Sequence, residues 1–161
     1  LNEMEDDIYD VAKPWFEGEG DPVPLLRESL SGYVKICYRR GPILRAVADA
    51  ATTDKKLEQS WAKLMNGFEK AIAERIAQQQ AAGFISQFPP RPVAVALNRL
   101  DAAVVIEMFG RRPRGNPDEV LEALERIWIS TLYGAQALEQ PVTSPPKRNL
   151  KKKPCPQKER E

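Results

Sequence analysis

The sequence contains no histidine and only two cysteines, Cys37 and Cys155. Without histidine there is no His-based catalytic triad, no zinc site with histidine ligands and no Glu-x-x-His di-iron motif. Two distant cysteines cannot form a four-cysteine zinc site, and they indicate a reducing compartment rather than a disulfide framework. Nucleophile elbows, Walker loops and dinucleotide fingerprints are also missing, so the sequence predicts neither an enzyme nor a cofactor.

Long apolar runs are absent as well. The most apolar segment, residues 93–109, is interrupted by Arg99, Asp101 and Glu107, which argues against a membrane span. The first ten residues hold five acids and no apolar block, unlike a secretion signal. We therefore expect a cytoplasmic protein with no membrane partner.

The composition is that of one globular domain, with 161 residues of which 42% are hydrophobic and 29% charged. The net charge is +1, but residues 141–161 carry a net charge of +5, which leaves −4 for residues 1–140. We predict a helical domain over residues 1–140, whose acidity disfavours nucleic acid, and a disordered Pro/Lys-rich tail over residues 141–161. A weaker alternative is that this tail contacts nucleic acid or anionic membrane.

Apolar residues recur at steps of three and four along most of the chain, and no stretch alternates like a strand, which predicts an all-α fold. We expect a short helix over residues 2–17, kinked or ended by Pro14. A second helix should run from residue 21 to about 39, followed by a sharp turn at Gly41-Pro42 and a short helix to about residue 51. The longest helix should begin at residues 52–54, reach Ala81 and stop at Gly83.

Residues 93–133 predict two further helices joined by the link Gly110 to Asn116. The second of them opens with Asn116-Pro117-Asp118-Glu119, a pattern of N-cap, first-position proline and early carboxylates. This pair has more apolar surface than one core can absorb, which indicates a subunit interface. The predicted fold is a bundle of about six helices that dimerises through the last two.

Several segments resemble the C-terminal half of TetR-family transcriptional regulators, most of all the branch that includes the ethionamide-response repressor. They are Ala96-Leu97-Asn98 within a buried helix, the link ending at Asn116-Pro117, the run Arg126-Ile-Trp-Ile-Ser-Thr-Leu-Tyr-Gly134, and the order of the helices over about residues 1–138. The N-terminal helix-turn-helix module of such regulators has no counterpart here. The resemblance therefore implies a ligand-binding and dimerisation domain that contacts DNA only through a module missing from this chain.

In such regulators a small, mostly apolar effector enters a tunnel in each subunit of a homodimer, and a linking helix moves in response. Carried over to this sequence, the resemblance implies pocket walls from Leu26, Leu30, Tyr33 and Cys37, from Trp61, Met65, Phe68 and Ile72, and from Asn98, Asp101 and Val105, with Trp128 behind them. Asn98 could contact the ligand or only cross-link helices. A paired Arg75 or Asp101 could change the charge preference of the pocket, and Cys37 should be an inert buried thiol.

The alternative interpretation is a helical protein-interaction or scaffold module without a ligand. In that case the same apolar stripe would form a solid core, and no cavity of useful size would remain inside the bundle.

Overall fold

A computed structural model describes residues 2–139, so the predicted basic tail lies outside the described residues. Within this part of the chain all regular structure is helical, which confirms the predicted all-α class. The elements are α1 (Asn2–Glu17), α2 (Pro22–Ala50), α3 (Lys55–Ala81), α4 (Pro90–Phe109), α5 (Pro117–Tyr133) and a short 3-10 helix, η1 (Ala135–Glu139).

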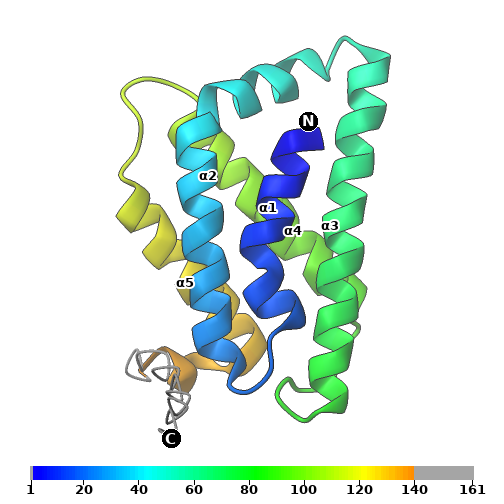
Figure 1. Ribbon diagram of the computed structural model, residues 1–161, viewed down its shortest axis with the longest axis vertical. Coiled ribbons are helices and arrows are strands. Elements are labelled where there is room, and N and C mark those ends of the chain that lie inside the picture. Colours follow the sequence, from blue (N-terminus) through cyan, green and yellow to red (C-terminus); the bar gives the residue numbers. More distant parts are fainter. Residues whose placement is uncertain (1, 140–161) are drawn as a thin grey trace, which may run out of the picture.

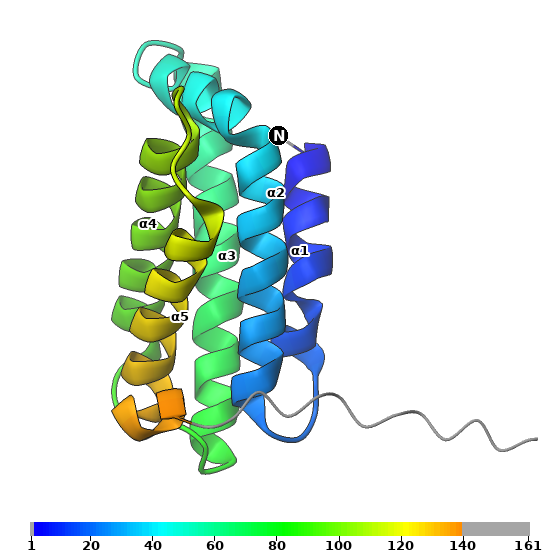
Figure 2. The ribbon, with the colours of Figure 1, turned by 90° about the vertical axis from the view of Figure 1, so that its left-hand side faces the viewer.

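The helices form three layers, seen edge-on in Figure 2. Helix α1 lies on one side, α2 and α3 form the middle layer, and α4 and α5 form the opposite side. In Figure 1, α4 runs obliquely behind α1 and crosses both middle helices. This arrangement brings all five α-helices around one interior.

Side-chain caps begin three of these helices where the sequence predicted them. The Asp21 carboxylate accepts the backbone N–H of Val23, and the Asp54 carboxylate accepts two N–H groups of the first turn of α3. Asn116 accepts the N–H of Asp118 at the start of α5. These acceptors satisfy donors that a helix N-terminus would otherwise leave unpaired. At the other end of α3, Gly83 adopts a φ of +83°, as its place after the last turn predicted.

The predicted break at Gly41-Pro42 is wrong. Helix α2 continues through Pro42 to Ala50, although its last third turns away from the first part in Figure 1. A Cβ on Gly41 would lie 2.3 Å from the backbone oxygen of Phe109, so the bend lets the end of α4 pack directly on the α2 backbone. Pro14 likewise lies inside α1 and does not end it. The described chain therefore has five α-helices rather than about six.

The buried apolar side chains form two clusters. One gathers around Trp15, Ile76 and Ile129, and the other around Phe109, Leu124 and Val105. Residues of both clusters line the cavity described below, so the cavity lies where the two clusters meet.

Candidate functional site

A cavity of about 90 Å³ lies inside the bundle, and every α-helix contributes to its wall. All twelve residues that the resemblance implied as pocket walls line this one cavity: Leu26, Leu30, Tyr33, Cys37, Trp61, Met65, Phe68, Ile72, Asn98, Asp101, Val105 and Trp128. Their arrangement around a common space is thus a property of the fold. That they bind a ligand stays a prediction.

Sequence reasoning missed the contribution of α1 to the wall. This helix supplies Met4, Ile8, Ala12, Trp15 and Phe16. Met4, Ile8 and Trp15 are at helical spacing in the sequence, which is the signal that could have indicated an inward-facing stripe on this helix. The other residues missed are Ser29, Leu44, Leu64, Ala102 and Ile106. Helix α1 thus forms one wall of the cavity.

Asp101 is the one charged residue in this otherwise mostly apolar wall, and its residue surface is only 7% exposed. The indole Nε1 of Trp128 donates to both of its carboxylate oxygens, at 2.9 and 3.1 Å. Burial raises the pKa of Asp101 from 3.8 to about 7, because desolvation disfavours the charged form more than the indole hydrogen bond favours it. The carboxyl group is therefore poised to change charge near neutral pH.

Two further titratable groups face Asp101 from α2. Burial is the main cause of the raised pKa of Tyr33, with Cys37 and Asp101 as smaller causes. Burial also raises the pKa of Cys37 to about 12. A thiol with so high a pKa stays protonated and unreactive near neutral pH, as predicted for an inert buried cysteine.

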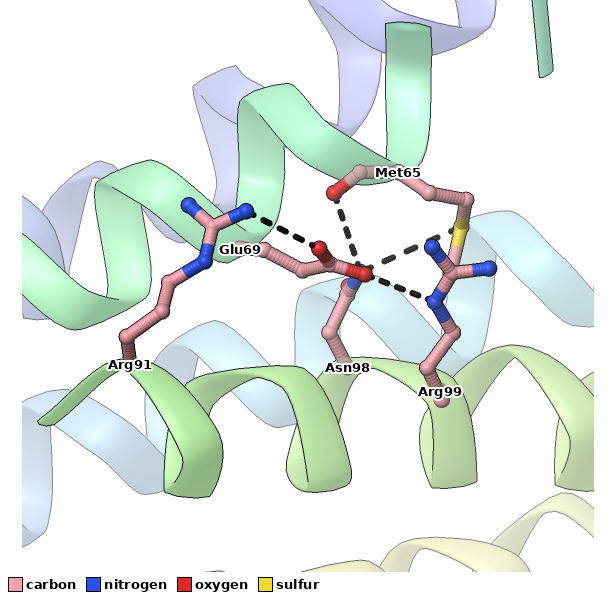
Figure 3. A network of polar contacts seen from close by, with 5 residues as sticks. All are labelled: Met65, Glu69, Arg91, Asn98 and Arg99. Carbon is pink, nitrogen blue, oxygen red and sulfur yellow. Dashed lines mark hydrogen bonds and ion pairs between the residues drawn. The ribbon is translucent and has the colours of Figure 1, made fainter. Parts of the chain in front are cut away.

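Asn98 cross-links two helices. Its Nδ2 donates to the backbone oxygen of Met65 at 3.3 Å, and it lies 3.9 Å from the Met65 sulfur (Figure 3). Beside it, Glu69 is 2% exposed and pairs with Arg99 at 2.7 Å and Arg91 at 3.4 Å. These contacts fasten α3 to α4 at the cavity wall. The cross-linking role of Asn98 is therefore observed, while its contact with a ligand is still a prediction.

Arg75 is not in the cavity wall. Its guanidinium donates to the backbone oxygens of Trp15 and Gly18, at 2.7 and 2.6 Å. The Trp15 indole N–H donates to the Tyr133 hydroxyl at 2.8 Å, and the Trp15 backbone N–H donates to Ser29 Oγ at 3.1 Å. The C-terminal end of α1 is thus attached to α2, α3 and α5. Of the two residues expected to set the charge of the pocket, only Asp101 lies in its wall.

Over residues 2–139 there is no group of three or more side chains suited to hold a metal ion. No helix in this range is long and apolar enough to cross a membrane. The cavity wall presents a broad apolar surface, the three amide or hydroxyl groups of Asn98, Ser29 and Tyr33, and one acid.

Residues 26–134 match the family model described as the C-terminal domain of the transcriptional regulator EthR. The match begins within α2, ends after α5, and covers more than half of the 161 residues. No curated protein matches the chain. The chain belongs to this family of TetR-type regulatory domains, which is not an enzyme family.

Proposed function

We propose that this domain senses a small hydrophobic or amphiphilic effector and regulates transcription as the cytoplasmic homodimer of a TetR-type regulator, which contacts DNA through a separate helix-turn-helix module. The observation that carries the proposal is the cavity, with its wall drawn from all five α-helices and lined by the twelve predicted residues. Family membership supports a regulatory role over a catalytic one.

The size of the cavity bears on how such sensing works. Pockets for drug-sized ligands measure roughly 300 Å³ or more, whereas this cavity measures about 90 Å³. A larger effector therefore binds only when part of the wall moves outward. A ligand shifts a conformational equilibrium only when its affinity for the two conformations differs. An effector too large for the narrow cavity would bind the widened conformation more tightly, which couples effector binding to movement of the wall.

Helix α1 is the part of the wall that we expect to move. Its C-terminal end is held by the contacts of Trp15 with Ser29, Arg75 and Tyr133. Its N-terminal half is held by fewer polar contacts, chiefly the partly exposed pair of Arg40 with Asp7 at 2.5 Å. An outward swing of α1 about its C-terminal end would enlarge the cavity and transmit effector binding toward the N-terminus.

A second part of the proposal is dimerisation through α4 and α5. The buried residues of α4 form one stripe, Ala94, Leu97, Asp101, Val105 and Phe109. Part of its outward face is apolar and not buried by the single chain, with Ala96 and Ala103 exposed and Leu100 half-buried, beside the exposed charges of Arg99 and Glu107. Ala123 on α5 is exposed as well. Helices α4 and α5 lie on the side of the molecule opposite α1 in Figure 2, and a second copy packed on them would form a four-helix seam.

Ligand binding is tested with neutral n-alkanols, from butanol to octanol, by calorimetry and by the shift in melting temperature. We expect saturable binding that raises the melting temperature and weakens in Trp61→Ala and Asn98→Ala. Ala102→Leu should also weaken it by filling the cavity, while Ala77→Leu on the exposed face of α3 serves as the matched control. Binding that none of the three cavity variants changes would contradict the assignment and favour a solid scaffold module.

The oligomeric state is tested by light scattering coupled to size exclusion. We expect a dimer that Ala103→Arg on the outward face of α4 dissociates, because the new charge would be buried in the seam. Ala77→Arg places the same charge on α3 and should leave the dimer intact. A monomeric wild-type chain, or a dimer insensitive to Ala103→Arg, would rule out this seam.

A further inference from the structure

We propose that the cavity selects an apolar molecule with a protonated amine, whose ammonium group pairs with the Asp101 carboxylate beside the aromatic wall. This inference rests on the proposed function, since it assigns a charge class to the effector of the same cavity.

The carboxylate of Asp101 has unused capacity to accept hydrogen bonds. Two carboxylate oxygens can accept about four of them. Within residues 2–139, the donor to Asp101 is the single indole N–H of Trp128, shared by both oxygens. None of the ion pairs in this part of the chain includes Asp101. A buried acid in an apolar cavity without a cation is costly unless a ligand supplies one.

No other charged side chain lines the cavity, so none there pairs with Asp101 in place of the ligand or attracts the ammonium group away from it. The titratable residues that line it besides Asp101 are Tyr33 and Cys37 of α2, and burial raises the pKa of both, which keeps them neutral. The lining residues from α1, α3 and α5 include no titratable side chain. The cavity therefore presents one potential negative charge and no positive one.

The aromatic wall also suits a cation. Six lining residues are aromatic: Trp15, Phe16, Tyr33, Trp61, Phe68 and Trp128. The faces of such rings attract a desolvated ammonium group, and their hydrophobic area packs against the alkyl part of an amine. A neutral alcohol of equal length would gain only the second of these interactions.

Binding of a cation should also change the number of protons bound to the protein, and this change can be measured. Because the pKa of Asp101 is about 7 in the free protein, the carboxyl group is largely protonated below neutral pH. An alkylammonium ion keeps its own proton, so pairing requires Asp101 to ionise and release one proton to the buffer. Amine binding at pH 6 should therefore release up to about one proton, whereas alkanol binding should release none.

The experiment compares primary n-alkylamines with n-alkanols of the same chain length by calorimetry, in two buffers of different ionisation enthalpy. For the wild type we expect the amine to bind at least about tenfold more tightly, the effect of one charge-assisted hydrogen bond to a buried carboxylate. Asp101→Asn retains an acceptor for Trp128 and should fold, which its melting curve checks. It should bind the amine no more tightly than the alkanol of equal length, and it should lose the proton release.

Glu74→Gln, which removes an exposed carboxylate from α3, is the matched control and should leave the preference unchanged. Alkanol binding without an amine preference overturns this inference and leaves the proposed cavity function standing. An amine preference that persists in Asp101→Asn also overturns it, because the amine would then bind elsewhere. Failure of both ligand series overturns the proposed function as well.

Discussion

The indole N–H of Trp128 on α5 is shared between the two carboxylate oxygens of Asp101 on α4, at 2.9 and 3.1 Å. This contact joins the two outer helices across the cavity wall. It also holds an acid whose pKa of about 7 makes both helix packing and cavity charge depend on pH.

The first prediction concerns the pH dependence of stability. The pKa of Asp101 is about 7 in the folded state, against the ordinary value of 3.8 for an aspartate in the unfolded chain, so between these values the unfolded state binds fewer protons. Stability therefore falls as pH rises from about 4 to 7, and the loss is complete above the folded pKa. Asp101→Asn lacks this titration, so its free energy of unfolding should gain a few kcal/mol relative to wild type across that window. Denaturant melts from pH 4 to 8 test this, and parallel curves for the two proteins would contradict it.

The second prediction concerns Glu69, which is 2% exposed between two arginines. Replacing both Arg91 and Arg99 by alanine should cost about 3 kcal/mol, the low end for a buried charge left unpaired, because water can enter where the arginines stood. Lys70→Ala removes one partner of an exposed pair at 3.9 Å and should cost almost nothing. Urea unfolding compares the two variants, and equal costs would show that Glu69 is not held by its arginines.

The third prediction uses two helical glycines. Gly41→Ala places a Cβ 2.3 Å from the backbone oxygen of Phe109, and backbone cannot move aside cheaply. We expect a loss of about 3 kcal/mol or more. In Gly67→Ala the Cβ meets its nearest atom, the Tyr9 hydroxyl oxygen, at 3.5 Å, so better helix propensity should stabilise the protein by about 0.5–1 kcal/mol. Thermal melting distinguishes them by the opposite signs of their shifts.

The fourth prediction concerns the anchor of α1. Ser29 Oγ accepts the backbone N–H of Trp15 at 3.1 Å and donates to the backbone oxygen of Ala12 at 3.3 Å. Ser29→Ala removes both bonds at a buried position and should cost about 1–3 kcal/mol. Ser60→Ala removes an exposed bond to the oxygen of Lys56 and should change stability by less than about 0.5 kcal/mol. Hydrogen exchange should also show faster opening of α1 in Ser29→Ala alone.

Local signals in the sequence were sufficient to predict where most of the helices lie. Asp54 and Asn116 are N-caps because their short side chains reach backbone N–H groups of the turn that directly follows them. Helical spacing likewise places the apolar residues of each helix on one stripe. Caps and stripes are local features that the sequence reveals without knowledge of the fold, whereas the grouping of these residues around one pocket was implied by the resemblance to TetR-family regulators.

Contacts between residues far apart in the sequence decided the features that local signals did not predict. Pro42 continues a helix because the bend at Gly41 is filled by the end of α4, a contact that nothing near Gly41 in the sequence indicates. Arg75 points to the backbone of α1 rather than into the cavity, since the end of that helix offers two carbonyl oxygens. The charge state of Asp101 likewise depends on how deeply neighbouring helices bury it, which is a property of the assembled bundle. Sequence alone thus determined the helices and their apolar faces, whereas the tertiary structure decided which polar groups those faces enclose.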